Sequence, residues 1–190
     1  MKRSLMIVAL AFSTMAMAAA GAPTDPEIAH IAVTANQIDV DAAKFALTKT
    51  KNDTVKQFAN TMITDHTGVI AKATELVTKL KVTPKDNPTS KSLKQNADKA
   101  KAELRKKSGA DFDKAYVDNE VAYHEAVIGA VDTVLIPNAQ NAELKALLTQ
   151  VRPALQAHLE HARQLQSELA GGAATTGSHE HGTKPASTGK

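Results

Sequence analysis

The 190-residue sequence predicts an all-α protein: a four-helix bundle with an extra helix in one long connection. Three observations lead to this fold class. Apolar residues recur at helical spacing over long segments, alternating strand patterns are lacking, and breaks rich in proline, glycine or polar residues separate the segments. The expected long helices are residues 25–50, 52–80, 110–135 and 141–169, and the extra helix is residues 90–107.

The first two expected helices have a clear start and a short connection. Asp25 can cap a helix whose first turn contains Pro26, and an apolar stripe follows as far as Phe45. The polar break at residues 51–53 is short, so the next helix, 52–80, is expected to run antiparallel to the first.

The long connection contains the extra helix. Pro84 and Pro88 predict a loop, and residues 90–107 form a mostly polar helical pattern. Between Lys91 and Lys107 the net charge is +5. We interpret this segment as a solvated crossover helix packed outside the bundle, the alternative being a docking face for an anionic surface.

The last two expected helices are separated by Ile136-Pro137-Asn138, which should end residues 110–135. The following helix, 141–169, contains Pro153 within its apolar pattern. An interior proline removes a backbone hydrogen bond and clashes with the preceding turn, so we expect a kink or a split there.

The two ends of the chain are expected to lie outside the domain, which is residues 21–170. Residues 1–20 have a basic start, a short apolar run and small residues suited to cleavage, so they predict a cleaved signal peptide and export to the periplasm; a retained anchor is the alternative. The chain has no cysteine, which fits a periplasmic helical domain that needs no disulfide bonds. Residues 171–190 predict a disordered tail, in which His179 and His181 offer at most weak metal capture.

The charge balance argues against nucleic acid as a partner. The whole chain has a pI of about 9.0, but without the signal and the tail it carries 19 basic and 19 acidic residues. Aromatic residues, which would stack on bases, make up 3% of the chain. The apolar run of the signal is too short for a stable membrane span, and the sequence does not define an oligomeric state.

Three histidines carry the evidence for a site. His66, His124 and His158 fall on or beside the apolar faces of three different expected helices, where aliphatic residues would be usual. Glu120 lies one turn from His124, and Asp39 lies at a step of the first apolar stripe. The three histidines, with Glu120 or Asp39, suit one transition-metal ion such as zinc, copper or iron.

Two alternatives stay open at this point. Asp39 is either an inward ligand or a solvated residue at the border of its stripe. The histidines are either ligands or buried polar residues bonded to Asp65, to the tyrosines at 116 and 123, or to backbone carbonyls.

Counting residues from the helix connections tests whether the candidates lie at one level. Asp39 and His66 come within about 5 Å of each other along the bundle axis. His124 and His158 are mismatched by about 9 Å when the turn is placed at Asn138, and by less if the connection extends to Asn141. Glu120 matches the level of His158 better than His124 does.

A dinuclear iron site is short of ligands. That pattern needs a Glu-x-x-His motif on each of two helices, but Ile63 precedes His66 by three residues and Leu155 precedes His158. No nucleophile with a local base and no glycine-rich phosphate loop offers other chemistry. The sequence therefore favours a protein without enzymatic activity.

Several motifs together resemble a known family. They are Phe58-Ala59-x-x-Met62-x-x-Asp65-His66, Ser108-Gly109-Ala110-x-Phe112-Asp113-x-x-Tyr116, His124, and Pro153-x-Leu155-x-x-His158-Leu159. From residues 26 to 169 the chain resembles the exported bacterial ferritin-like family called domain of unknown function 4142.

The resemblance implies a ferritin-like four-helix fold in the periplasm or cell envelope. The three helix histidines of the family correspond to His66, His124 and His158, and its acidic positions on the first helix to Asp39 and Asp41, where glutamate is usual. The resemblance implies no settled activity.

The sequence supports three hypotheses of function. The first is a periplasmic bundle that binds a metal ion or small ligand at its histidine-lined centre. The second is a non-catalytic envelope stress or interaction protein with structural histidines. The third is a di-iron oxidoreductase, against which the missing carboxylates count.

Overall fold

The computed structural model describes residues 21–175. Within this range the chain is all-α, and no residue is assigned to a strand. The expected signal, residues 1–20, and the tail histidines His179 and His181 lie outside the described residues.

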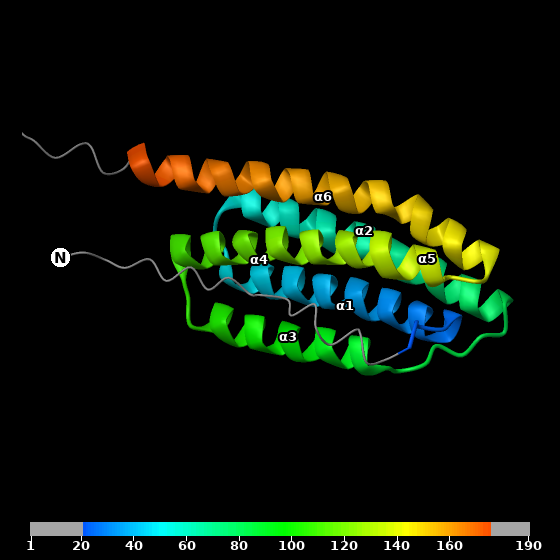
Figure 1. Ribbon diagram of the computed structural model, residues 1–190. Coiled ribbons are helices and arrows are strands. Elements are labelled where there is room, and N and C mark those ends of the chain that lie inside the picture. The colour runs from blue at the N-terminus through cyan, green and yellow to red at the C-terminus, as the bar shows by residue number, and fades with distance from the viewer. Residues whose placement is uncertain (1–20, 176–190) are drawn as a thin grey trace, which may run out of the picture.

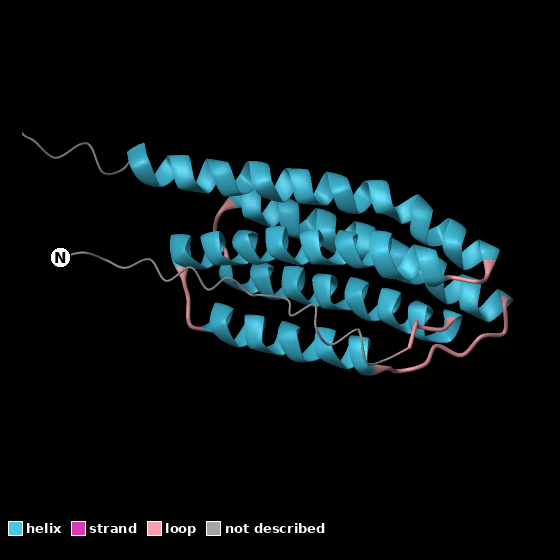
Figure 2. Cartoon of the chain, viewed as in Figure 1, coloured by secondary structure: helices cyan, strands magenta, loops and turns pink. Residues whose placement is uncertain are grey.

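The helices follow one another with short connections, except between α2 and α4. The elements are α1 (Asp25–Lys49), α2 (Asp53–Lys79), α3 (Pro88–Arg105), α4 (Gly109–Ala130), the π-helical segment η2 (Val131–Leu135), α5 (Ile136–Asn138) and α6 (Ala142–Thr175). Figure 2 shows that the loops lie only at the ends of the long helices. Helices therefore supply almost all side chains of the core, and Ala139 in the α5–α6 connection is an exception.

Local sequence explains where the first helices begin. The Glu27 carboxylate accepts a 3.0 Å hydrogen bond from the backbone N–H of Thr24, the residue before α1. The Asn52 side chain caps α2 by accepting hydrogen bonds from the N–H groups of Thr54 and Val55, at 2.9 and 3.2 Å.

The long helices α1, α2, α4 and α6 run side by side, and α3 lies along the outer side of α1 (Figure 1). α1 packs mainly against α2, and α4 mainly against α6. The position of α3 agrees with the expected crossover helix, whose thin apolar stripe needs only one partner.

The last helices run further than expected, and one of the two alternatives for Pro153 is excluded. Helical backbone continues past Leu135 through η2 and α5 to Asn138, because Pro137 falls in the first turn of α5, where its missing N–H costs little. α6 is not split at Pro153, since buried Leu148 and Leu155 hold it to the core on both sides. It also extends to Thr175, beyond the expected domain end at residue 170.

The core has two parts, one at each end of the long helices. The aromatic cluster consists of Phe58, Phe112 and Tyr116 packed with Ala43, Ala46, Val55, Ala59, Met62, Leu104, Val117, Ala162 and Leu165. The aliphatic cluster consists of Ile28, Ile31, Ile128, Val131, Leu135, Ala139, Leu144, Leu148, Leu155 and Leu159.

Among residues 21–175, no helix is both long enough and apolar enough to cross a membrane.

Candidate metal centre

The five predicted site residues meet in one buried layer between the aromatic and aliphatic clusters. α1 supplies Asp39, α2 supplies His66, α4 supplies Glu120 and His124, and α6 supplies His158; all five side chains are buried. Asp39 is 1% exposed, so the interpretation of this residue as a solvated border residue was wrong. Asp39 lies at the border of the apolar stripe of α1, and this border faces the centre of the bundle.

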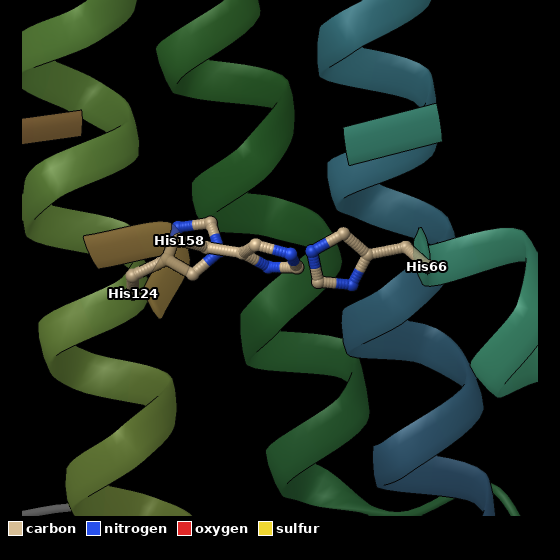
Figure 3. Close-up of side chains that lie close together, drawn as sticks. All are labelled: His66, His124 and His158. Carbon is tan, nitrogen blue, oxygen red and sulfur yellow. The ribbon is translucent and has the colours of Figure 1, made fainter. Parts of the chain in front are cut away.

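The three histidine rings lie close together and come from three helices (Figure 3). Their ring centroids are 5.7 Å apart for His66 and His124, 5.1 Å for His66 and His158, and 5.5 Å for His124 and His158. One ring nitrogen from each histidine lies within 4.8 Å of the other two. Three imidazoles gathered in this way are a common transition-metal ligand set.

One nitrogen of each histidine is held by an outer partner. His66 Nδ1 lies 2.7 Å from Asn36 Oδ1, and the Asn36 amide nitrogen donates to the Ala32 carbonyl oxygen at 2.8 Å, which fixes the orientation of the amide. His124 Nδ1 lies 3.0 Å from the Glu120 carbonyl oxygen. These partners can only accept, so both Nδ1 atoms carry the proton.

His158 is held in the opposite sense, through Nε2, which lies 2.9 Å from Asp65 Oδ2. The second ring nitrogens are then the lone-pair nitrogens: Nε2 of His66, Nε2 of His124 and Nδ1 of His158. These three atoms are buried and have no hydrogen-bond partner among the described residues. Metal-binding histidines show this arrangement, with one nitrogen oriented by an outer acceptor and the other left for the ion.

The two carboxyl groups differ in where they lie. Asp39 Oδ2 is 3.3 Å from His66 Nε2 and 3.5 Å from His124 Nε2, so it faces two lone-pair nitrogens. Glu120 Oε2 is 3.7 Å from His124 Nδ1, on the proton-bearing side of that ring. Asp39, Glu120 and His124 form a second group whose possible ligand atoms lie within 4.8 Å of one another. Asp39 is therefore the better-placed carboxylate for an ion held by the histidines.

Burial shifts the protonation of both carboxyl groups. It raises the pKa of Asp39 from 3.8 to about 8. Burial also raises the pKa of Glu120 well above its ordinary value, and the neighbouring Asp39 charge adds to the effect. Neither carboxylate forms an ion pair with Lys or Arg among the described residues. A bound cation would supply the missing charge and favour their ionised forms.

Burial has the opposite effect on the histidines. It lowers the pKa of His66 to about 3, and the electrostatic effect of the neighbouring His124 and His158 adds to this. Burial likewise lowers the pKa of His124 to about 4, against the hydrogen bond to the Glu120 carbonyl, which raises it. Both imidazoles are thus neutral at pH 7, which is the form that binds metal ions.

The ring of His124 lies beside that of His158, as the alternative of a connection that extends to Asn141 allowed. The count had placed the turn at Asn138, but α5 extends to that residue and the connection is residues 139–141. Counted from Gln140, His124 is 16 residues back and His158 is 18 forward. The remaining difference of two residues corresponds to about 3 Å of helix rise.

Two partners of the site were only partly foreseen. Asp65 was among the expected hydrogen-bond partners, and it holds His158. Asn36 was not in the predicted set, although its position three residues before Asp39 places it on the same face of α1. Tyr123 donates instead to the Ala35 carbonyl oxygen at 2.8 Å, so its hydroxyl does not hold a histidine.

The comparisons with known proteins identify the family and nothing closer. The chain matches the family described as Domain of unknown function (DUF4142) over residues 11–165. Searches of curated proteins and of solved structures found no match. The match covers more than half of the chain, so the chain belongs to the DUF4142 family.

Proposed function

We propose that this member of the DUF4142 family is an exported, ferritin-like four-helix bundle that binds one transition-metal ion through His66, His124 and His158. One observation carries the proposal. In each of the three histidines an outer acceptor holds one ring nitrogen, and the other nitrogen is buried, carries a lone pair and has no hydrogen-bond partner within residues 21–175.

The cost of burying unpaired polar atoms supports an ion at this place. Both oxygens of Asp39 and Oε2 of Glu120 also lack hydrogen-bond partners among the described residues. A buried polar group without a partner costs about 1–3 kcal/mol. Six such atoms in one layer are therefore expensive to keep, and a cation shared by them would remove much of that cost.

The ligand chemistry favours zinc, copper or iron over magnesium or calcium. Three imidazole nitrogens with one carboxylate suit the transition metals, whereas magnesium and calcium prefer oxygen ligands. Asp39 is the fourth candidate ligand. The dinuclear iron alternative has only Asp39 and Glu120 as unpaired buried carboxyls beside the histidines, and lacks both Glu-x-x-His motifs, so a single ion fits better.

The remaining parts of the proposal rest on sequence and topology. Residues 1–20 support export to the periplasm. The ferritin-like assignment is supported by four long helices and a long α2–α4 connection that contains its own helix. We infer a role in metal handling in the cell envelope, without turnover of a substrate.

The test is a zinc, copper and iron(II) titration of the full chain carrying His179→Ala and His181→Ala. Replacing the tail histidines removes a competing site without shortening the chain. We expect one ion per chain by calorimetry. Losing a residue that only hydrogen-bonds to a metal ligand weakens metal binding about 10–100-fold. His66→Ala and His158→Ala remove ligands themselves, so each should weaken binding by more than that.

His161→Ala is the matched control. His161 lies three residues after His158 on the same helix, but it is exposed and packs against Phe58. It should leave metal affinity unchanged. If micromolar concentrations of all three metals give no binding, or if His161→Ala weakens binding as much as His158→Ala, the metal proposal is wrong. The histidines would then be structural, as in an envelope interaction protein.

A further inference from the structure

A cavity of about 440 Å³ adjoins the histidine layer on the side of the aliphatic cluster. Its lining includes Asp39, His66, His124 and His158, so the candidate metal centre forms one end of it. The rest of the wall comes from all four long helices and from η2. The volume falls within the range of about 300–1,000 Å³ that is usual for small-molecule sites.

Away from the histidines, the wall is largely apolar. The deeper part is formed by alanine, valine and leucine side chains such as Ala32, Val127, Val131, Leu135 and Leu148. A water molecule needs two to four polar partners, and such walls offer few. The cavity therefore suits an apolar body better than a chain of waters.

The cavity opens to solvent between α2 and α6. Its lining residues on α1, α4 and η2 are buried or half-buried, whereas Gly68 and Lys72 on α2 and Gln150 and Ala154 on α6 are exposed. A molecule could thus enter between these two helices and reach the histidines without unfolding of the bundle.

Gly68 lies at this opening although local packing does not require glycine there. It is in the middle of α2, where glycine costs about 1 kcal/mol of helix stability relative to alanine. A Cβ atom built on Gly68 meets no other atom within 4 Å, and its backbone is helical. The small residue leaves the opening clear.

We propose that the cavity binds a small amphipathic molecule. Its apolar body would lie between α2 and α6, and its single oxygen-bearing group would reach the ion at the histidines. This inference rests on the proposed function, because the ion is what would hold the polar group. The three histidines would fill three positions on the ion, and the oxygen-bearing group would take the fourth in place of Asp39.

The experiment titrates decanoate, octanoate and acetate into the zinc-loaded full chain that carries His179→Ala and His181→Ala. The three probes share the carboxylate and differ in their apolar body. Burial of a methylene group corresponds to about a fourfold gain in affinity, so octanoate should bind about 15-fold more weakly than decanoate. Acetate should bind far more weakly than either, and equal binding of the three would overturn the inference.

Gly68→Leu and Gly129→Leu form a matched pair for the cavity. Both glycines are exposed, lie within helices and have no atom within 4 Å of a built Cβ, but only Gly68 lines the cavity. Gly68→Leu should weaken decanoate binding about tenfold or more, as loss of about two buried methylenes would. Gly129→Leu should not, and both should bind zinc as the parent chain does. An equal effect of the two substitutions on decanoate would overturn the inference.

His158→Ala separates this inference from the proposed function. In that variant, without zinc, decanoate should bind more weakly but keep its advantage over octanoate. Zinc binding without decanoate binding overturns the cavity inference alone. If zinc does not bind, the proposed function fails, and decanoate binding that Gly68→Leu abolishes would still support the apolar site. A dimer that Gly68→Leu dissociates, seen by light scattering, would instead assign the opening to a second copy and overturn the inference.

Discussion

The two ends of the bundle are built from different side chains and have different packing. In the aromatic cluster, Phe112 contacts Phe45 edge-on and stacks on Tyr116, with ring centroids 5.9 and 6.4 Å apart. The aliphatic cluster has no aromatic member among the described residues. The 440 Å³ cavity is lined by Val131, Leu135 and other members of the aliphatic cluster and by none of the aromatic cluster.

This difference suggests that the aromatic end mainly stabilises the fold and that the aliphatic end provides space for binding. Large rings fill the space between helices and leave little room, whereas short aliphatic chains at the other end leave a cavity beside the histidine layer. The π-helical segment η2 lies at the cavity end, and two of its residues, Val131 and Leu135, line it. π-Helical turns are often found at functional sites.

The largest expected difference between the two ends is in the cost of a leucine-to-alanine substitution, made once at each end of α6. Leu165 belongs to the aromatic cluster and Leu148 lines the cavity, and they are 1% and 3% exposed. Leu165→Ala should lower the free energy of unfolding by about 4 kcal/mol, in the upper part of the usual range. Leu148→Ala should cost only about 2 kcal/mol, because a side chain beside a cavity has fewer contacts to lose.

Chemical denaturation of both variants measures the difference. Equal losses would show that the cavity does not loosen its surroundings, and the contrast between the two ends would have no energetic basis.

Most of the fold could be predicted because it follows from local signals. α1 and α2 start at Asp25 and Asp53, within one residue of the predicted starts, although the cap of α1 is Thr24 and not Asp25 as expected. The long apolar periodicity fixes which faces are buried. The end of α4 could not be predicted, because Pro137 is compatible either with ending a helix or with starting a new turn. In the structure, the π-helical segment η2 connects α4 to α5, so the helical backbone continues.

The composition of the site could be predicted, but its arrangement could not. Histidines at aliphatic positions are visible in a sequence, since burial of a polar ring is unusual there. Which nitrogen of each ring is free depends on Asn36, the Glu120 carbonyl and Asp65, and so on the tertiary structure. The cavity depends on how side chains from five elements fill space, which no periodicity contains.

Substitution of Asn36 tests whether the metal affinity of the histidine layer depends on its own hydrogen bonds and not on the packing of either cluster. Its amide oxygen accepts from His66 and so directs the Nε2 lone pair inward. Asn36→Ala should weaken zinc binding about 10–100-fold while secondary structure is kept. Calorimetry measures the affinity, circular dichroism measures the helix content, and Asn60→Ala, an exposed position on α2, is the control. An affinity unchanged by Asn36→Ala would mean that His66 needs no outer partner.

The charge of the layer should make stability depend on pH in the metal-free protein. The folded pKa of Asp39, about 8, exceeds its ordinary value of 3.8, so the folded state holds the proton more tightly. This stabilisation is complete below pH 3.8 and is lost as the pH rises through 8. His66 and His124, with lowered pKa values of about 3 and 4, act in the opposite direction, and their contribution is complete above pH 6.5.

Between pH 6.5 and 8 the carboxyl groups of the layer therefore decide the slope. The free energy of unfolding should fall as the pH rises, with each of the two carboxyl groups contributing up to about 1.4 kcal/mol per pH unit, and Asp39→Asn should reduce that slope. Urea denaturation at intervals across this window, in the presence of a chelator, measures it. A stability that rises with pH in this window, or a slope unaffected by Asp39→Asn, would contradict the raised pKa.

The smallest expected effect concerns two glycines, one at the cavity and one away from it. Gly68→Ala and Gly129→Ala each place a methyl group in open space on a helix, so each should raise the free energy of unfolding by about 0.5–1 kcal/mol. Thermal denaturation of the metal-free chains measures both. Equal gains would mean that Gly68 lowers stability without any packing need, which is expected of a residue kept small for access to a site. A loss of stability confined to Gly68→Ala would instead show that α2 and α6 close on each other there, and that the opening serves packing rather than entry.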